Sequence, residues 1–280
     1  MDKNKQQILK SGLYLVSTPI GNMEDITFRS LNILKKSDLI LCEDTRRSAK
    51  LLSHFQIKNK LFAYHKFNEK KVSEKVVNLI MENKIISLIS DAGTPTISDP
   101  GILLVNKCIE KNLNVYPIPG PSAVTSAISV SGFTDKYLFY GFLKKKENEL
   151  NNELKKIKNL NYSIVFFIPA SKINFYILKF KEYFPDRKIL IAKEMTKIYE
   201  EFIRSETTFV NEFEGLKGEL TVVLSNKTNI KNNKEISESI KMEIKKMLKK
   251  YTHKDVVEFI SKKENLSKKI IYNYCLKLKK

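Results

Sequence analysis

The chain has 280 residues, of which 42% are hydrophobic, and is therefore long enough to bury a sizeable core in about two domains. Its three cysteines lie far apart and its three histidines lack metal-ligand spacing, which argues against a zinc site, a disulfide framework and metal-dependent hydrolysis. The formal net charge of +19 favours a polyanionic partner such as RNA or DNA, and without a membrane-length apolar run we expect a cytoplasmic protein with no membrane contact.

The first half of the chain alternates short β-branched runs with stretches of helical spacing. Strands are predicted at residues 13–17, 38–42, 61–64, 84–89 and 114–118. Each strand is followed by a predicted helix, and these helices end near residues 36, 55, 82, 109 and 130. The first helix begins at Ile26, and Asp25 is its expected N-cap. Because strands alternate with helices, we expect a mainly parallel sheet.

The second half begins with a polar, charged helical stretch at residues 144–158, which we interpret as the hinge between two domains. Strands follow at residues 162–168, 188–192, 200–204 and 218–224, with a helix at 173–184. From Asn226 the composition shifts to Lys, Asn, Glu and Ser, and three helical patterns follow. We therefore expect an N-terminal α/β lobe at residues 1–143, a second α/β lobe at 144–228 and a basic helical C-terminal domain at 229–280.

The longest polar loop, residues 90–101, reads SDAGTPTISDPG and lies between a buried strand and a helix. Its two prolines and two glycines prevent either element from continuing through it. In an open α/β sheet, ligands bind at the carboxyl ends of the strands, where this loop is expected. An ordinary surface turn is the alternative, but such a turn would be shorter and would not need two Asp, two Thr and two Ser.

Two shorter loops of the same kind follow other predicted strands, TPIGN at residues 18–22 and PGPSA at residues 119–123. The sequence has no GxGxxG, GxxxxGK[ST] or GxSxG motif, so nothing indicates a dinucleotide fingerprint, a triphosphate loop or a nucleophile elbow. The three loops offer backbone donors and hydroxyls but few lysines, which favours a zwitterionic or adenosyl-type ligand over a polyphosphate. At Gly93 and Gly120 we expect the backbone to approach a ligand or to adopt a positive φ.

The basic composition is weak evidence for a nucleic-acid partner by itself, because 45 of the 50 basic residues are Lys and such a bias can come from the coding genome. The arginines are more specific. Three of the five, Arg29, Arg46 and Arg47, lie in one N-terminal region. The planar guanidinium fork suits bidentate contact with phosphate or carboxylate, so this region is a candidate for such contacts.

The three loops, together with EDTR at residues 43–46 and the block at residues 192–200, resemble the ribosomal RNA small subunit methyltransferase I branch of the tetrapyrrole-methylase superfamily. The resemblance covers about residues 12–225, and the C-terminal helices also fit. It implies a two-lobed α/β fold with a ligand cleft between the lobes and a small C-terminal helical appendage. It also implies a homodimer that uses S-adenosylmethionine, with no metal required, to methylate the ribose 2′-hydroxyl of a cytidine in 16S rRNA at the decoding site of the 30S subunit.

By position, the resemblance also implies a set of cofactor-binding residues. The methionine end of the cofactor would be lined by Thr94, Pro95, Ile97, Ser98 and Asp99, with Ser122 and Ala123 close by. Ile168 and the backbone near Leu220 would frame the adenosine from the second lobe. The full predicted set is Pro19, Gly21, Gly93, Thr94, Pro95, Ile97, Ser98, Asp99, Gly120, Ser122, Ala123, Ile168, Leu220 and Thr221.

Two segments depart from the family pattern. IPASKI at residues 168–173 stands where the family has Tyr-Glu-Ser-x-His-Arg, so no role of that Glu, His or Arg carries over to this chain. Phe67 stands at a usual His position. We therefore expect substrate contacts or cofactor affinity to differ from the family pattern.

The sequence does not decide which of the two lobes supplies the group that would accept the hydroxyl proton. Asp44 or its neighbour Glu43 could do so with help from Arg46, but simple N-capping by Asp44 is an equal alternative. Glu194, with Lys193, competes for the role from the second lobe. The predicted catalytic residues are Asp44, Arg46 and Glu194, and the predicted substrate-binding residues are Arg29, Arg47, His65 and Lys197. Of these, His65 could be an ordinary loop residue and Lys197 a solvated cation.

Two other classes of function remain open. A methyltransferase of the same superfamily could act on a small tetrapyrrole or diphthine-type substrate, although the basic C-terminal helices and the EDTR block favour RNA. A nucleic-acid-binding protein without catalytic activity would leave the three shaped loops unexplained. Cofactor binding separates this last class from the other two, and substrate screening separates those two from each other.

Overall fold

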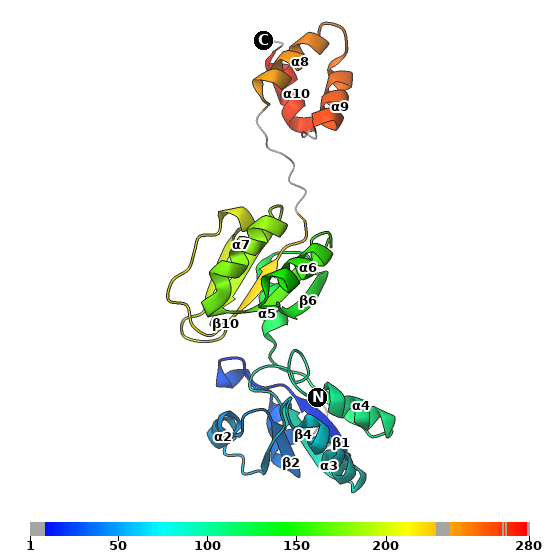
Figure 1. Ribbon diagram of the computed structural model, residues 1–280, viewed down its shortest axis with the longest axis vertical. Helices are drawn as coiled ribbons and strands as arrows, with labels where there is room; N and C mark the ends of the chain where they lie inside the picture. Colours follow the sequence, from blue (N-terminus) through cyan, green and yellow to red (C-terminus); the bar gives the residue numbers. More distant parts are fainter. Residues whose placement is uncertain (1–8, 228–235, 265, 267, 279–280) are drawn as a thin grey trace, which may run out of the picture. The chain divides into compact units, whose positions relative to one another are not determined.

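The computed structural model describes residues 9–227, 236–264, 266 and 268–278, and the chain divides into two compact units at residues 1–226 and 227–280. The larger unit contains two five-stranded sheets, which form its first and second lobes (Figure 1). This architecture is the α/β class with C-terminal helices that the sequence predicts.

The first sheet has the strand order β3-β2-β4-β1-β5, and all of its neighbouring strands are parallel. Its strands are β1 (Gly12–Val16), β2 (Leu39–Cys42), β3 (Leu61–Ala63), β4 (Ile85–Ile89) and β5 (Val115–Ile118). Four helices connect them: α1 (Phe28–Lys36), α2 (Thr45–His54), α3 (Glu69–Met81) and α4 (Ile102–Glu110). Since the strands are parallel, the loops after them meet at one edge of the sheet.

Helices cover both faces of the first sheet. Leu34 of α1 and Leu52 of α2 share one apolar core with Ile40 and other strand residues. Val76 of α3 and Leu104 of α4 belong to a separate core on the other face. Strands buried on both faces have near-continuous apolar sequences, and this explains the short β-branched runs that predict them.

The second sheet has the order β6-β7-β10-β8-β9, in which only β6 and β7 are parallel among the paired strands described. Its strands are β6 (Tyr137–Phe142), β7 (Ser163–Pro169), β8 (Lys188–Lys193), β9 (Glu201–Glu206) and β10 (Glu219–Leu224). Helices α6 (Glu147–Ile157) and α7 (Ile173–Tyr183) pack on one face of this sheet, and α5 (Ala123–Ser131) packs on the other (Figure 1).

The second lobe begins earlier than the sequence predicts. Strand β6 was not predicted, and because it pairs with β7, the second sheet starts at Tyr137 rather than after residue 143. A register shift between Phe139 and Gly141 interrupts the strand, so its side chains do not show the period of two by which a half-buried strand is recognised.

Two local predictions are wrong. The helix at residues 147–157 is not a hinge, because Leu150 and Leu154 are fully buried in the core of the second lobe. Asp25 does not cap α1. That helix begins at Phe28, and the hydroxyl of Thr27 accepts a hydrogen bond from the Ser30 amide at 3.0 Å.

The smaller unit contains three helices among its described residues: α8 (Glu238–Met247), α9 (His253–Glu264) and α10 (Lys268–Lys277). Ile244, Val256, Ile260 and Ile271 are buried in its own apolar core. Across the described residues of the whole chain, no helix is both long enough and apolar enough to span a membrane.

Candidate active site

The three Gly/Pro loops converge at the carboxyl edge of the first sheet. Thr18 and Gly93 form an isolated antiparallel bridge, with backbone N–H···O distances of 2.9 and 3.0 Å. The hydroxyl oxygens of Ser17 and Thr94 lie 3.0 Å apart, and the Thr94 hydroxyl also donates to the Pro121 carbonyl at 3.4 Å. Loops that are separate in the sequence therefore build one polar surface.

Of the alternatives predicted for the two loop glycines, a positive φ is confirmed at Gly93, and the approach of either backbone to a ligand stays a prediction. Gly93 has a φ of +79°, a conformation that L side chains rarely adopt. At Gly120 a Cβ atom would lie only 2.8 Å from the Cβ of Ser17, so this position has no room for a side chain. The requirement for glycine therefore comes from backbone conformation at Gly93 and from packing against Ser17 at Gly120.

The 90–101 loop also contains two strained residues that are not glycine. Thr96 has a φ of +72° and Ser98 a φ of +69°. A left-handed conformation costs a non-glycine residue on the order of 1–3 kcal/mol, and for β-branched threonine it is a genuine outlier. Strain of this kind concentrates at ligand sites, where the surrounding structure maintains it.

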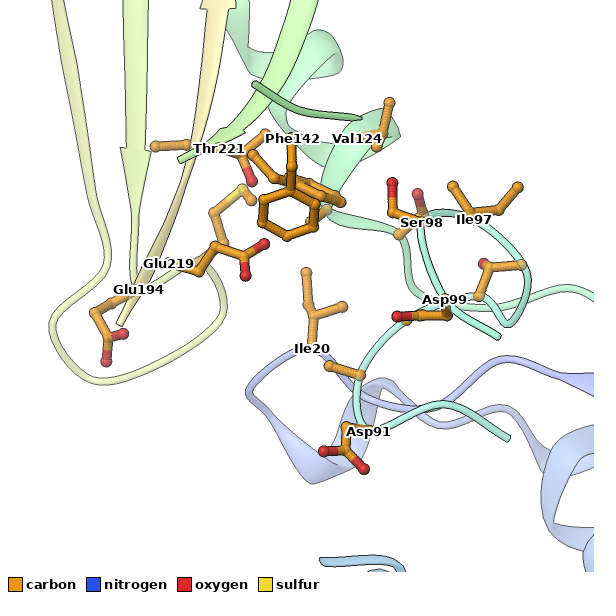
Figure 2. A pocket seen from close by; sticks show the side chains of 18 of the residues that line it. Ile20, Asp91, Ile97, Ser98, Asp99, Val124, Phe142, Glu194, Glu219 and Thr221 are labelled. Atoms are coloured by element: carbon orange, nitrogen blue, oxygen red, sulfur yellow. The ribbon is translucent and has the colours of Figure 1, made fainter. Parts of the chain in front are cut away.

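A cavity of about 370 Å³ lies between this loop surface and the strand ends of the second lobe. Figure 2 shows Phe142 and Glu219 projecting from the second lobe toward Ile20, Asp91 and Asp99 of the first. Its lining from the first lobe is Ile20, Arg47, residues 91–94, Ile97, Ser98, Asp99 and residues 122–124. Its lining from the second lobe is Phe142, Phe167, Ala192, Glu194, Met195, Lys197, Glu219 and Thr221.

The cavity is acidic although the chain is strongly basic. Four carboxylates and two cations line it: Asp91, Asp99, Glu194 and Glu219 against Arg47 and Lys197. Both cations are paired, Arg47 with Asp91 at 3.0 Å and Lys197 with Glu194 at 2.9 Å. The site therefore favours a ligand that carries positive charge and disfavours a polyphosphate.

Asp99 is the most perturbed carboxyl group of the cavity. Burial is the main cause, and the charges of Glu43, Asp91 and Glu219 add to it, so that the pKa of Asp99 rises to about 6. Burial likewise raises the pKa of Glu219. A cation in the cavity would relieve this repulsion.

An aromatic wall closes the cavity on the side of the second lobe. The Phe167 ring lies 5.5 Å from the Phe142 ring and 5.0 Å from the Phe139 ring, centroid to centroid. Phe142 and Phe167 line the cavity together with Ala192 and Met195. This wall suits a flat or apolar part of a ligand.

The predicted catalytic residues divide between the lobes. Glu194 lines the cavity, whereas Asp44 and Arg46 do not. Asp44 caps α2 by accepting a hydrogen bond from the Arg46 amide at 2.8 Å, and its second oxygen pairs with the Arg46 guanidinium at 2.9 Å. These hydrogen bonds from Arg46 lower the pKa of Asp44 to about 2, which makes its carboxylate a poor proton acceptor.

Among the predicted substrate-binding residues, Arg47 and Lys197 line the cavity. His65 follows β3, near enough to Glu43 for its charge to oppose the rise in the pKa of that carboxyl. Arg29 lies on α1, is exposed and does not line the cavity.

Eight of the predicted cofactor residues line the cavity: Gly93, Thr94, Ile97, Ser98, Asp99, Ser122, Ala123 and Thr221. Pro19, Gly21, Pro95 and Gly120 belong to the same loops but do not line it. Ile168 and Leu220 are fully buried in the core on the far face of the second sheet, so their side chains point away from the cavity. Their neighbours Phe167 and Thr221 face it instead.

Sequence reasoning missed several lining residues. Glu219 stands two positions before Thr221 on the same strand, and this spacing places both on one face, so strand periodicity could have identified it. Phe142 could not be found because its strand was not predicted.

In the described part of the chain, no three His, Cys, Asp or Glu side chains are grouped so that they could hold a metal ion.

Residues 12–208 match the family model described as Tetrapyrrole (Corrin/Porphyrin) Methylases. The chain is 40% identical over 279 residues to "Ribosomal RNA small subunit methyltransferase I" of Rickettsia prowazekii, covering 97% of this chain and 99% of that protein. It is 44% identical over 219 residues to the protein of the same name from Thermotoga maritima, covering 77% of this chain and 98% of that one.

Among solved structures, the fold resembles that of uroporphyrin-III C-methyl transferase from Thermus thermophilus, crystallised with S-adenyl homocysteine. The TM-score is 0.54 at 13% sequence identity, and the match covers 76% of this chain and 97% of that one. At this identity the likeness establishes the two-lobed fold.

Proposed function

Because the chain belongs to the ribosomal RNA small subunit methyltransferase I family of the tetrapyrrole methylases, we propose that it transfers a methyl group from S-adenosylmethionine to small-subunit rRNA. In finer detail, the proposed acceptor is the ribose 2′-hydroxyl of a cytidine in 16S rRNA, at the decoding site of the 30S subunit. The proposed enzyme is a cytoplasmic homodimer. The observation that carries the proposal is the acidic cavity between the lobes of a basic chain.

The charge of the cavity fits the cofactor. S-adenosylmethionine has a positively charged sulfonium and an ammonium group, and four carboxylates line the cavity. Asp99, whose pKa is raised by burial and by neighbouring carboxylates, gains most from a nearby cation. Asp99 and Asp91 would therefore hold the cationic methionine end of the cofactor.

The remaining lining fits the other parts of the cofactor. Thr94 and Ser122 offer hydroxyl groups at the loop surface of the first lobe. Phe142 and Phe167, opposite them, offer an apolar wall for the adenine ring. A polar surface facing an apolar wall is the distribution that an adenosyl ligand requires.

The protein's part in the reaction is alignment and proton transfer. When bound, the cofactor supplies an electrophilic methyl group on sulfur and departs as a neutral thioether, so the chain need not stabilise a departing anion. The cavity walls hold the ribose oxygen in line with that methyl group and exclude water. Glu194 accepts the hydroxyl proton, and Lys197, 2.9 Å away, keeps this carboxylate in position.

Cofactor affinity is expected to fall as the pH drops below about 6. The pKa of Asp99 is about 6 in the free protein, and a bound cation favours the ionised carboxylate, so binding at lower pH must release a proton. The dissociation constant should then rise about tenfold per pH unit until the pKa of the complex is reached. Calorimetry from about pH 8 to about pH 5 measures this. Asp99→Asn should remove the part of the dependence that comes from Asp99 and leave only that of Glu219, and an affinity of the wild-type protein that stays constant over this range would contradict the assignment.

The smaller unit is the proposed RNA-binding element. Residues 227–280 contain sixteen lysines and six carboxylates, a density of positive charge suited to phosphate contacts. Removing this unit should leave cofactor binding unchanged, weaken binding to 16S rRNA and flatten its salt dependence. Filter binding across a salt series measures the slope. If the truncated protein kept the slope of the full chain, the lysines would not contact RNA.

The position of the methyl group tests whether the acceptor is the ribose 2′-hydroxyl of a cytidine at the decoding site. After incubation of 30S subunits with protein and cofactor, nucleoside mass spectrometry should detect 2′-O-methylcytidine, and fragment mapping should place it at the decoding site. A base-methylated nucleoside, or a methylated ribose on another nucleotide, would overturn the finer proposal while leaving rRNA methylation intact. Sedimentation equilibrium tests the homodimer separately.

A further inference from the structure

Residues 194–200, between β8 and β9, form a loop at the edge of the cavity, which we name the rim loop. Three internal hydrogen bonds give it a fixed shape. The Lys197 amide donates to the Glu194 carbonyl at 3.0 Å, and the Glu200 amide donates to the Lys197 carbonyl at 3.1 Å. The Thr196 amide donates to the Glu200 carboxylate at 2.6 Å.

The rim loop is also tied to the first lobe. The Asn22 amide donates to the Thr196 hydroxyl at 2.9 Å, across the two lobes. Gly21 packs so closely that a Cβ atom there would lie 2.6 Å from the Lys197 side chain and 2.8 Å from the Met195 carbonyl. Glu194 and Thr196 have φ values of +49° and +64°, so these contacts maintain a strained backbone.

The two sides of the rim loop differ. Glu194, Met195 and Lys197 line the cavity. Ile198 and Tyr199, at the next two positions, are 93% and 77% exposed. The loop therefore holds an apolar side chain and an aromatic ring in solvent on a fixed backbone, immediately beside the cavity.

Two of the three carboxylates on and beside the rim loop are paired with lysines. Glu194 is paired with Lys197 and Glu201 with Lys193, at 2.9 and 3.1 Å. The third, Glu200, accepts a hydrogen bond from the Thr196 amide. If an RNA strand places one ribose in the cavity, the neighbouring nucleotides cannot enter the same space. The strand must therefore continue across the edge of the cavity.

We propose that Tyr199 stacks against the base of an unpaired nucleotide next to the one being methylated, with Ile198 extending the same contact. The inference rests on the proposed function and deepens it, because it names single-stranded RNA with accessible bases as the ligand of the rim loop. Stacking on an aromatic side chain needs no particular base, so this contact fixes the position of the strand while the cavity selects the reacting ribose.

A binding experiment without catalysis tests the inference directly. The chain contains no tryptophan, so Tyr199→Trp introduces one fluorescent reporter. A short single-stranded RNA should quench it, and the same backbone without bases should not. Phe209→Trp is the matched control, because Phe209 is 73% exposed on the second lobe and does not line the cavity. Equal quenching by RNA with and without bases, or equal quenching of both reporters, would overturn the stacking contact.

Kinetics with 30S subunits supply the second readout. Tyr199→Ala should raise KM for the subunits about five- to a hundredfold, as expected for the loss of one stacked base, and leave the dissociation constant of S-adenosylmethionine unchanged. Tyr199→Phe should restore most of the affinity, and Phe209→Ala should behave as the wild type. An unchanged KM in Tyr199→Ala would contradict the inference. A loss of dimer mass in Tyr199→Ala would also contradict it, because a second copy of the chain would then cover the rim loop.

The two proposals fail separately. If the wild-type protein transferred no methyl group to RNA, the proposed function would fail, and base-dependent quenching at Tyr199→Trp would still report whether the rim loop binds bases. If methyl transfer occurred with no effect of any Tyr199 variant, only the rim-loop contact would be wrong.

Discussion

Replacing Glu194 with Gln is expected to slow methyl transfer about 10²- to 10⁴-fold and to change cofactor affinity far less. Glu194 is the one predicted catalytic residue that lines the cavity, and its carboxylate is held by Lys197 at 2.9 Å. The amide keeps the size of the side chain but cannot accept the hydroxyl proton. Single-turnover transfer from labelled cofactor to 30S subunits measures the rate, and calorimetry measures cofactor binding.

Asp44→Asn is the matched control for this substitution. Asp44 is also a carboxylate close to the end of a strand, but it caps α2 and pairs with Arg46 outside the cavity. The amide can still cap α2, so only the exposed ion pair with Arg46 is lost, and the melting temperature should fall slightly while turnover stays close to normal. A normal rate in Glu194→Gln with a slow rate in Asp44→Asn would reverse the assignment.

Replacing Gly93 with Val is expected to weaken S-adenosylmethionine binding at least tenfold, or about 1.4 kcal/mol. Gly93 lines the cavity at a φ of +79°, where a β-branched residue is strained. Relief of that strain would move the Gly93 backbone that pairs with Thr18. It would also move Thr94, whose hydroxyl donates to the Pro121 carbonyl. Calorimetry on the folded variant measures the affinity.

Gly215→Val separates this local effect from general destabilisation. Gly215 has a φ of +68°, a Cβ atom there would meet nothing within 4 Å, and the residue does not line the cavity. It therefore carries similar backbone strain without the loop contacts. The control should lose stability but bind cofactor normally. Equal losses of affinity in both variants would remove the 90–101 loop from the site.

The carboxyl edge of the first sheet was predictable from the sequence because parallel strands place their loops together whatever their spacing in the chain. The loops at residues 18–22, 90–101 and 119–123 each follow a clear apolar strand, and their glycines indicate restricted backbone positions. The meeting of Ser17, Thr94 and Pro121 follows from this topology.

The second lobe was harder to predict for two physical reasons. Strand β6 carries a register shift at Gly141, so its sequence does not alternate, and the aromatic wall built on Phe142 could not be foreseen. Strands β7 and β10 were predicted, but which of their side chains face the cavity was not. A shift of one residue exchanges the cavity face for the core face, and this is why Ile168 and Leu220 are buried while Phe167 and Thr221 face the cavity.

The roles of the carboxylates could not be settled by sequence spacing. Asp44 follows a strand at the correct edge of the sheet. However, both of its carboxylate oxygens accept hydrogen bonds from the nearby Arg46 guanidinium, in a local ion pair. Asp99 lies in a loop with no charged residue between it and Asp91, but its raised pKa depends on burial and on Glu43 and Glu219, which come from distant parts of the chain. Such electrostatic effects require the folded arrangement.

The most direct test of the account is methyl transfer from labelled S-adenosylmethionine to intact 30S subunits, bare 16S rRNA and a tetrapyrrole, measured side by side with wild-type protein and Glu194→Gln. We expect label to enter RNA with the wild-type protein, at a rate that falls about 10²- to 10⁴-fold in the variant. Label in the tetrapyrrole alone, or label in RNA at the same rate with both proteins, would contradict it.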